Sequence, residues 1–142
     1  MRQIPYILIL LISIILFSCK KKEIAAYAEC DTFTKLTESA TVSKLVGSWA
    51  WVRRSCYQNP QTAADKNTII TFNTNATFSV LEDGNIVTQG TWKVKIIDDK
   101  VWGLDLSNES EYLNGYILFC KGNEVSFDDS RYDACIYTFI RK

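Results

Sequence analysis

The side chains that carry out most enzyme chemistry are sparse in this chain of 142 residues. It contains no histidine, so the commonest general base and the commonest metal ligand are both missing. Five cysteines and a few clustered charges are the remaining candidates. We therefore expect a protein that is not an enzyme, needs no cofactor and holds no metal ion.

One cysteine lies close to the N-terminus, and the other four lie in the rest of the chain. Cys19 directly follows an apolar N-terminal run, whereas Cys30, Cys56, Cys120 and Cys135 are spread through the rest of the chain. No two of these four have the close C-x-x-C spacing that is typical of a zinc site. In an exported protein an even number of cysteines favours disulfides, and four cysteines allow three connectivities. We expect two disulfide bonds.

Two clusters of charged residues are weaker candidates for binding. Asp128–Ser130, followed by Arg131, could offer carboxylates to a cation. Arg53 and Arg54, close to Tyr57, could bind an anionic ligand at a rim. Both patterns are more typical of solvated turns and strand ends, so we expect neither to be a site.

The N-terminus has the pattern of a lipoprotein export signal. Residues 4–17 are an almost unbroken apolar run, shorter than the about 20 residues of a transmembrane helix. The tetrapeptide LFSC at residues 16–19 resembles the lipobox of bacterial lipoproteins, in which the cysteine is acylated and becomes the new N-terminus. The resemblance implies a signal peptide over residues 1–18, acyl chains such as palmitate on Cys19, and a lipidated tether over residues 19–36. The alternative is an uncleaved anchor with an incidental cysteine.

Acylation would attach the protein to a membrane, since two or three acyl chains anchor a protein far better than one. Lys20–Lys22 would add attraction to anionic headgroups. In familiar gram-negative lipoproteins an aspartate after the acylated cysteine favours the inner membrane, and this chain has Lys20 at that place. The resemblance thus implies the envelope of a gram-negative bacterium, with the outer membrane favoured.

The charge balance argues against one class of partner. The chain has 16 basic and 16 acidic side chains, whereas binding to nucleic acid requires a clustered cationic surface. We expect no nucleic-acid partner. The length allows one domain, which we assign to residues 37–142.

We expect strands to position the cysteines and the charged clusters, because from residue 49 onward hydropathy alternates with a period of two. A helix is predicted only over residues 37–45, with Gly47 as its stop signal. Gly, Asn and Asp supply the turns between the strands. Eight strands are predicted: Trp49–Tyr57, Thr68–Asn73, Ala76–Glu82, Ile86–Ile97, Val101–Leu106, Tyr112–Cys120, Glu124–Asp128 and Ala134–Ile140.

Short connections predict that sequential strands are antiparallel neighbours. Eight such strands favour closure into an up-and-down barrel, because closure removes both exposed edges. The alternative is a two-sheet β-sandwich, which usually has a long crossover. The long connection Gln58–Asn67 follows the first strand, where a barrel of this kind has a lid-like loop. We predict an all-β fold, an eight-stranded antiparallel barrel with a short N-terminal helix.

Several of these segments resemble the lipocalin superfamily. LVGSWAW at residues 45–51 contains a Gly-x-Trp signature before the first strand. Residues 70–80 and 90–106 resemble the second to fifth strands of small bacterial lipocalin-like lipoproteins. The resemblance covers residues 44–142.

The resemblance implies how one end of the barrel is closed. Trp49 would plug the narrow end, and Gly47 would let the backbone pass closely beneath it. Arg141 would lie over the indole ring, a cation–π contact worth about 0.5 to 2 kcal/mol. These three residues then have a structural role.

In such a barrel the meander order sorts the cysteines. Cys56 and Cys135 lie at the open end of the first and last strands, which closure makes neighbours, so these two can pair. Cys120 lies at the closed end, roughly 15 Å or more from Cys135, beyond the about 7 Å Cα separation of a disulfide. Cys30 is then its partner. Because Cys56 is out of phase with the tryptophans of its strand, a β-bulge or an outward-facing bond is needed.

Alternation also predicts which side chains face the interior: Trp51, Phe78, Val80, Trp92, Val94, Trp102, Leu104, Tyr116, Leu118, Phe127, Tyr137 and Phe139. The candidates for contact with a small apolar ligand are Trp51, Phe78, Trp92, Trp102, Tyr116, Phe127 and Tyr137. An eight-stranded barrel is just wide enough to be filled by side chains or to hold one small molecule. Seven Phe, seven Tyr and four Trp favour a filled interior over a pocket.

Two functions are consistent with this pattern. The first is a lipid-anchored envelope protein that binds a small hydrophobic ligand in its barrel. The second is a protein-interaction or inhibitor module that acts through loops such as Gln58–Asn67, over a filled barrel.

Overall fold

The computed structural model describes residues 30–31, 36–56, 59–98, 101–129 and 134–142. The predicted signal peptide, Cys19 and most of the tether lie outside the described residues. The described elements, in chain order, are β1 (Cys30–Asp31), α2 (Glu38–Leu45), β2 (Gly47–Cys56), β3 (Asn59–Ala63), β4 (Thr68–Phe72), β5 (Thr77–Glu82), β6 (Asn85–Ile97), β7 (Val101–Leu106), β8 (Tyr116–Cys120), β9 (Glu124–Asp128) and β10 (Cys135–Arg141).

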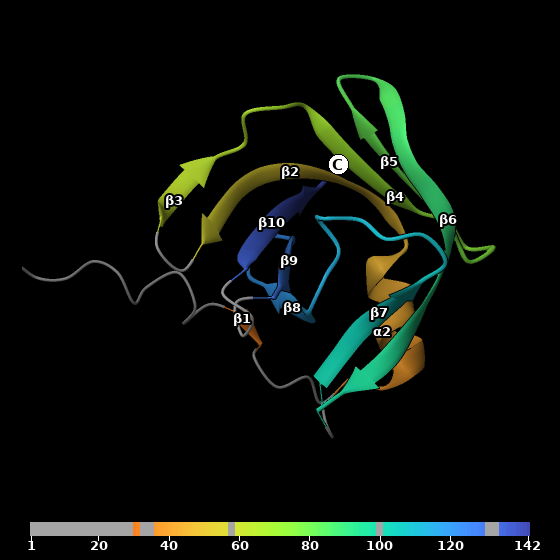
Figure 1. Cartoon of the computed structure of the whole chain (residues 1–142). Helices are drawn as coiled ribbons and strands as arrows, with labels where there is room; N and C mark the ends of the chain where they lie inside the picture. Colours follow the sequence, from red (N-terminus) through yellow and green to blue (C-terminus); the bar gives the residue numbers. More distant parts are fainter. Residues whose placement is uncertain (1–29, 32–35, 57–58, 99–100, 130–133) are drawn as a thin grey trace, which may run out of the picture.

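Eight of the strands form a closed antiparallel barrel. Their order is β8-β7-β6-β5-β4-β2-β10-β9, and β9 pairs with β8 to complete the circle. The last strand lies beside the first, from Cys135 opposite Cys56 to Arg141 opposite Trp49. Figure 1 shows the ring, with β2 arching over β10 and β9. The predicted barrel is therefore confirmed, and the two-sheet sandwich is excluded.

Two further strands extend the barrel sheet at places where a barrel strand is only partly paired. β4 covers β2 from Gly47 to Ala50, and β3 pairs with the other half of the same edge. Likewise β7 meets β8 at one residue pair, Gly103 and Tyr116, and β1 pairs with the far end of β8. The predicted loop over residues 58–67 was therefore wrong in part, because unpaired β2 backbone recruits Asn59–Ala63 as a strand.

A β-bulge in β2 resolves the phase of the first strand. Thr138 lies opposite Arg53 and Phe139 opposite Trp51, so Val52 has no partner in β10. One extra residue reverses the alternation beyond it. Trp51 thus points into the core, whereas Arg53 two residues later does not.

Both predicted disulfides are present. Cys56 is bonded to Cys135 directly across the β2–β10 pair, and Cys30 is bonded to Cys120 across β1 and β8. The bulge brings Cys56 into register with its partner. The bonds join segments 90 and 79 residues apart in the sequence.

The prediction for β8 was wrong in its start and in its phase. The strand begins at Tyr116 instead of Tyr112, and its inward residues are Ile117 and Phe119 instead of Tyr116 and Leu118. Gly115 interrupts the predicted strand, because its φ is +79°. The segment after it, YILFC, is apolar throughout, so alternation could not reveal its phase.

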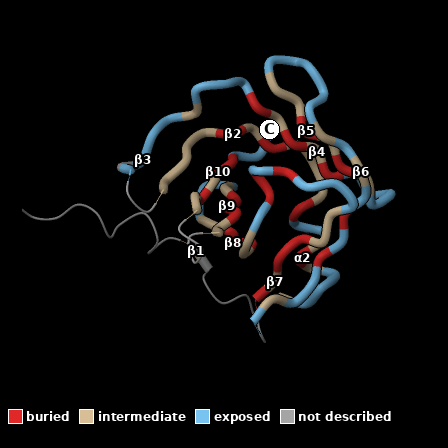
Figure 2. Tube along the Cα trace, viewed as in Figure 1, coloured by how far each residue is buried: buried red, intermediate tan, exposed pale blue. Residues whose placement is uncertain are grey.

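The interior is filled by side chains. Figure 2 shows buried residues along the barrel strands and on α2. Nearly all the inward positions carry large apolar groups, and Phe72, Phe78, Phe127 and Phe139 are at most 2% exposed. The core consists of Leu45, Trp49, Trp51, Ile70, Phe72, Phe78, Val80, Trp92, Val94, Leu104, Tyr112, Leu113, Ile117, Phe119, Val125, Phe127 and Phe139.

Trp49, near the start of β2, is buried at one end of the barrel. Its indole is 2% exposed, and its Nε1 donates to the Leu45 carbonyl at 2.7 Å. The Arg141 guanidinium carbon lies 4.2 Å from the ring centroid, and the same side chain donates to the carbonyls of Lys44 and Val46. These bonds tie the end of α2 to the last strand.

Gly47 is required at this end for two reasons. Its φ is +132°, which residues with a side chain rarely adopt. A Cβ atom at this position would also lie 2.6 Å from Nη1 of Arg141. The Gly-x-Trp pattern therefore makes room for the arginine that covers the tryptophan.

Candidate functional site

The other end of the barrel is closed by a loop. Residues 107–115 connect β7 to β8, and in Figure 1 this segment crosses the ring of strands. Its two apolar residues, Tyr112 and Leu113, are 3% and 2% exposed and belong to the core. The strand predicted to begin at Tyr112 therefore starts too early. The signal for a loop was present, since the sequence SNES precedes Glu111 and Asn-Gly follows Leu113.

The Tyr112 ring lies in a box of three other aromatic rings. Its centroid is 5.5 Å from that of Trp51, 5.2 Å from that of Tyr137 and 6.3 Å from that of Phe139. The interplanar angles are 60°, 75° and 83°, so all three contacts are edge-on. Rings prefer this arrangement, because the positive edge of one meets the negative face of another.

The polar end of Tyr112 meets a charged pair at the same mouth. Its hydroxyl donates to Oε1 of Glu82 at 2.7 Å, and the Lys66 ammonium bonds Oε2 at 2.7 Å. The hydrogen bond from Lys66, and then that from Tyr112, lowers the pKa of the Glu82 carboxyl. Burial, and then the bond to Glu82, raises the pKa of the Tyr112 phenol. At neutral pH the pair is therefore a carboxylate and a neutral phenol.

A further polar group faces this phenol. The Thr68 side chain is 1% exposed, and its hydroxyl has no hydrogen-bond partner within the described residues. Thr68 lies opposite Glu82 in the β4–β5 pair, and its hydroxyl lowers the pKa of the Tyr112 phenol without meeting full hydrogen-bond geometry. A buried hydroxyl without a partner is uncommon in proteins.

The seven predicted ligand contacts are divided between the mouth, the deeper core and the outer face. Trp51 and Tyr137 line the mouth around Tyr112. Trp102 is half-buried beside the core, and its Nε1 donates to the Leu36 carbonyl at 3.0 Å. Tyr116 was placed wrongly, because it lies outside the core and donates to Asp98. The remaining three, Phe78, Trp92 and Phe127, are buried in the deeper core.

An open cleft lies beside the loop. It has a volume of about 430 Å³, and Leu113 forms part of its wall together with Leu104 and Leu106 of β7. The other lining residues are Lys95, Ile97, Asp105, Glu109, Asn114, Gly115 and Asp129. The cleft thus has an apolar inner wall and a charged rim, at the place where β7 and β8 are least paired.

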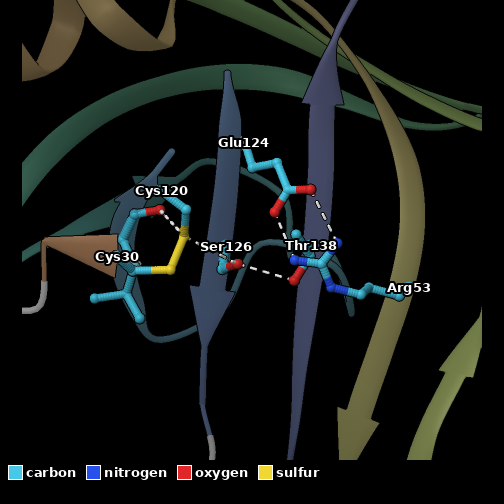
Figure 3. The surroundings of a disulfide bond; sticks show 7 residues. Cys30, Arg53, Cys120, Glu124, Ser126 and Thr138 are labelled. Carbon is cyan, nitrogen blue, oxygen red and sulfur yellow. Dashed lines mark hydrogen bonds and ion pairs between the residues drawn. A yellow bond between two sulfur atoms is a disulfide. The ribbon is translucent and has the colours of Figure 1, made fainter. Parts of the chain in front are cut away.

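A second cavity, of about 50 Å³, lies on the outer face of the sheet. Six strands contribute to its wall, from Cys30 of β1 to Gln61 of β3. Figure 3 shows its polar side, where Ser126 and Thr138 share a hydrogen bond of 2.9 Å. This volume is enough for a few water molecules.

The same view contains a bidentate ion pair. Arg53 donates to both carboxylate oxygens of Glu124, at 3.0 and 2.5 Å (Figure 3). The hydrogen bond to Glu124 raises the pKa of the Arg53 guanidinium. Arg53 therefore does not stand free at a rim, as an anion site with Arg54 and Tyr57 would require, and Tyr57 lies outside the described residues.

The acidic cluster after β9 is described only in part. The pKa of Asp129 is raised by burial and by the neighbouring Asp128. Ser130 and Arg131 lie outside the described residues. No group of three metal-ligating side chains occurs within the parts of the chain that the structure describes.

Comparison with protein-family models, with curated proteins and with solved structures gives no match for this chain. Across the described ranges, no helix has the length and apolar character needed to span a membrane. The β-barrel architecture is compatible with the lipocalin-like fold that the sequence resembles.

Proposed function

We propose that this protein is a lipid-anchored binding protein of the bacterial envelope, and that its barrel takes a small apolar ligand at the mouth that Tyr112 and Leu113 fill. One observation carries the proposal. The two side chains that fill this mouth come from a loop, so the space can be vacated without breaking any strand pair of the barrel.

The loop has open space beside it, and its bonds to β6 lie at its first two residues. The cleft beside Leu113 gives the segment room to move, and β7 and β8 on either side share one residue pair. Ser107 and Asn108, at the start of the segment, bond to Thr91 and Gln89 of β6. Beyond them the segment is held by its buried side chains and by the bond from Tyr112 to Glu82. Its displacement would expose Trp51 and Tyr137, two of the residues predicted to contact a ligand.

The free energy needed to withdraw the loop sets the apparent affinity of the barrel for its ligand. Withdrawal of two large apolar side chains costs about 4 kcal/mol, which leaves about one molecule in a thousand open. A ligand that fills the same space restores the lost contacts. Its apparent affinity is weaker than its affinity for the open form by about that factor of a thousand.

Acylation of Cys19 and the tether over residues 20–36 would hold the barrel near a bilayer. The lipobox resemblance supports this part of the proposal. Metabolic labelling with an alkyne fatty acid tests it. Label should enter the wild-type protein and be lost in Cys19→Ser. The control Cys30→Ser, analysed after reduction of the disulfides, should retain the label. Label in Cys19→Ser would contradict acylation at this residue.

The binding function can be tested on the Cys19→Ser chain. Native mass spectrometry of protein purified from its own host should reveal a bound small molecule. A bromoalkanol, which quenches indole fluorescence on contact, should quench saturably. Trp51→Phe should lose much of this quenching and Trp102→Phe should retain it, because of these two residues it is Trp51 that borders the Tyr112 site. Absence of both a bound molecule and saturable quenching would reject ligand binding.

A second candidate, a protein-interaction module, is favoured by a different observation. Ile86 and Val87, at the start of β6, are 60% and 50% exposed, although large apolar side chains on a monomer's surface usually occur singly. Cross-linking on host membranes should then yield a defined adduct that is lost in Ile86→Asp/Val87→Asp. An adduct that also forms with the double variant would reject this surface as the interface.

A further inference from the structure

Resting on the proposed function, we propose that the ligand is a small aromatic compound that carries a hydrogen-bond donor, of which a phenol is the simplest. The Tyr112 side chain is then an internal stand-in for the ligand. It lies at the mouth in the place, and with the contacts, that such a ligand would take when the loop withdraws.

The shape of the site favours an aromatic ring. Trp51, Tyr137 and Phe139 each meet the Tyr112 ring at angles of 60° or more, and the centroid distances are 5.2 to 6.3 Å. A flat ring satisfies all three contacts at once. An alkyl chain fills the same volume without the edge-to-face attraction that each pair of rings adds.

The charge of Glu82 selects a donor. An ionised carboxylate can only accept hydrogen bonds, and Lys66 already occupies Oε2. Withdrawal of Tyr112 leaves Oε1 without its donor in a mouth where the Glu82 side chain is 19% exposed. A ligand hydroxyl or N–H replaces that bond, whereas an ether or a hydrocarbon leaves the oxygen without a partner.

The hydroxyl of Thr68 is the second observation that points to a polar ligand atom. It is 1% exposed, faces the phenol end of Tyr112 and has no partner in the part of the chain that the structure describes. A hydroxyl on the ligand can both donate to Glu82 and accept from Thr68. Tyr112 donates to Glu82 but does not meet Thr68 in full hydrogen-bond geometry.

Three matched probes test the inference: para-cresol has a ring and a donor, para-methylanisole has a ring and an acceptor only, and toluene has the ring alone. Binding to the Cys19→Ser chain is followed by two-dimensional NMR, which detects weak complexes. We expect para-cresol to bind at least tenfold more tightly than either of the others, since loss of a hydrogen bond to a charged group costs that much. In Glu82→Gln the preference should fall several-fold, because charge-assisted hydrogen bonds are roughly twice as strong as neutral ones.

Two variants of the stand-in residue sharpen the test. Tyr112→Ala empties the ring site, so para-cresol should bind at least tenfold more tightly than to wild type, with the same preference over toluene. Tyr112→Phe keeps the ring and the packing but gives up the bond to Glu82, so it serves if Tyr112→Ala does not fold. In that variant para-cresol should bind several-fold more tightly than to wild type. Tyr116→Phe, on the outer face, should leave all affinities unchanged.

The outcomes separate the two proposals. Equal binding of toluene and para-cresol to the wild-type barrel overturns the donor requirement and leaves the proposed function standing. Binding of para-cresol to Tyr112→Ala but not to wild type shows that the native loop does not open, and overturns both. If no probe binds any variant while native mass spectrometry finds a bound apolar molecule, the ligand class is wrong and the binding function stands.

Discussion

Each end of the barrel is filled by an aromatic side chain, Trp49 at one end and Tyr112 at the other. Trp49 belongs to a barrel strand, and its indole is bonded to Leu45 and covered by Arg141. Tyr112 belongs to a loop, and its polar contact is with Glu82, whose side chain remains 19% exposed. Both rings are at most 3% exposed. The two rings are thus equally buried, but Trp49 is part of the sheet and Tyr112 is part of a loop.

The Trp49 end should show the largest loss of stability. Trp49→Ala removes a fully buried indole from a place that strand and helix hold rigid, so the cavity cannot collapse. We expect a loss of about 3 to 5 kcal/mol in the free energy of unfolding, measured by urea denaturation. Trp102→Ala, the same substitution at a half-buried tryptophan, should lose less. Equal losses would mean that the Trp49 end is not the rigid one.

Substitution at the Tyr112 end should cost less stability than substitution at the Trp49 end. Tyr112→Ala also deletes a buried ring, but the loop can move into the space that it leaves. We expect a loss of about 2 to 3 kcal/mol, below that of Trp49→Ala. Hydrogen exchange should rise in residues 107–115 and stay low in β2 and β10. Faster exchange throughout the barrel would contradict the independence of the loop.

Gly47→Ala tests the backbone of the rigid end. The substitution forces a side chain onto a φ of +132° and against Nη1 of Arg141, so we expect a loss of about 2 kcal/mol. Gly84→Ala is the matched control, because Gly84 has a φ of +87° but a Cβ there would meet nothing within 4 Å. It should lose about 1 kcal/mol. A loss as large in Gly84→Ala would show that the contact with Arg141 is irrelevant.

Acid should weaken the Tyr112 end by a smaller amount. The pKa of Glu82 in the folded protein is below its ordinary value of 4.5. Its contribution is therefore complete above about pH 4.5 and is lost as the pH falls through the lower folded value. The difference in melting temperature between wild type and Glu82→Gln should shrink between pH 6 and pH 3. A difference that grows in acid would contradict the ionised pair of Glu82 and Lys66.

The sequence was sufficient to predict the barrel and both disulfides. Eight runs of alternating residues, separated by turn residues, became the eight barrel strands. Cys56 and Cys135 could be paired because closure of the ring makes the first and last strands neighbours. The strands follow from a period that is local in the sequence, and the cysteine pair follows from their order once the ring is closed.

The candidate site could be predicted only in part. Trp51 and Tyr137 were expected to face the interior, whereas Tyr112 was assigned to a strand. In SEYLNGYILFC, apolar residues occur on both phases, so alternation does not separate a plug from a strand. Glu82 gave no signal at all, because it lies at the end of β5, 30 residues earlier in the chain.

The amino-acid sequence by itself determined most of the barrel strands and their antiparallel order, since hydrophobic period and turn chemistry act over a few residues. The tertiary structure decided the rest. Only closure of the ring leaves part of β2 unpaired for β3, places a bulge at Val52 and brings Tyr112 among Trp51, Tyr137 and Glu82. These are contacts between distant segments, and which of them form depends on the space that the other side chains leave.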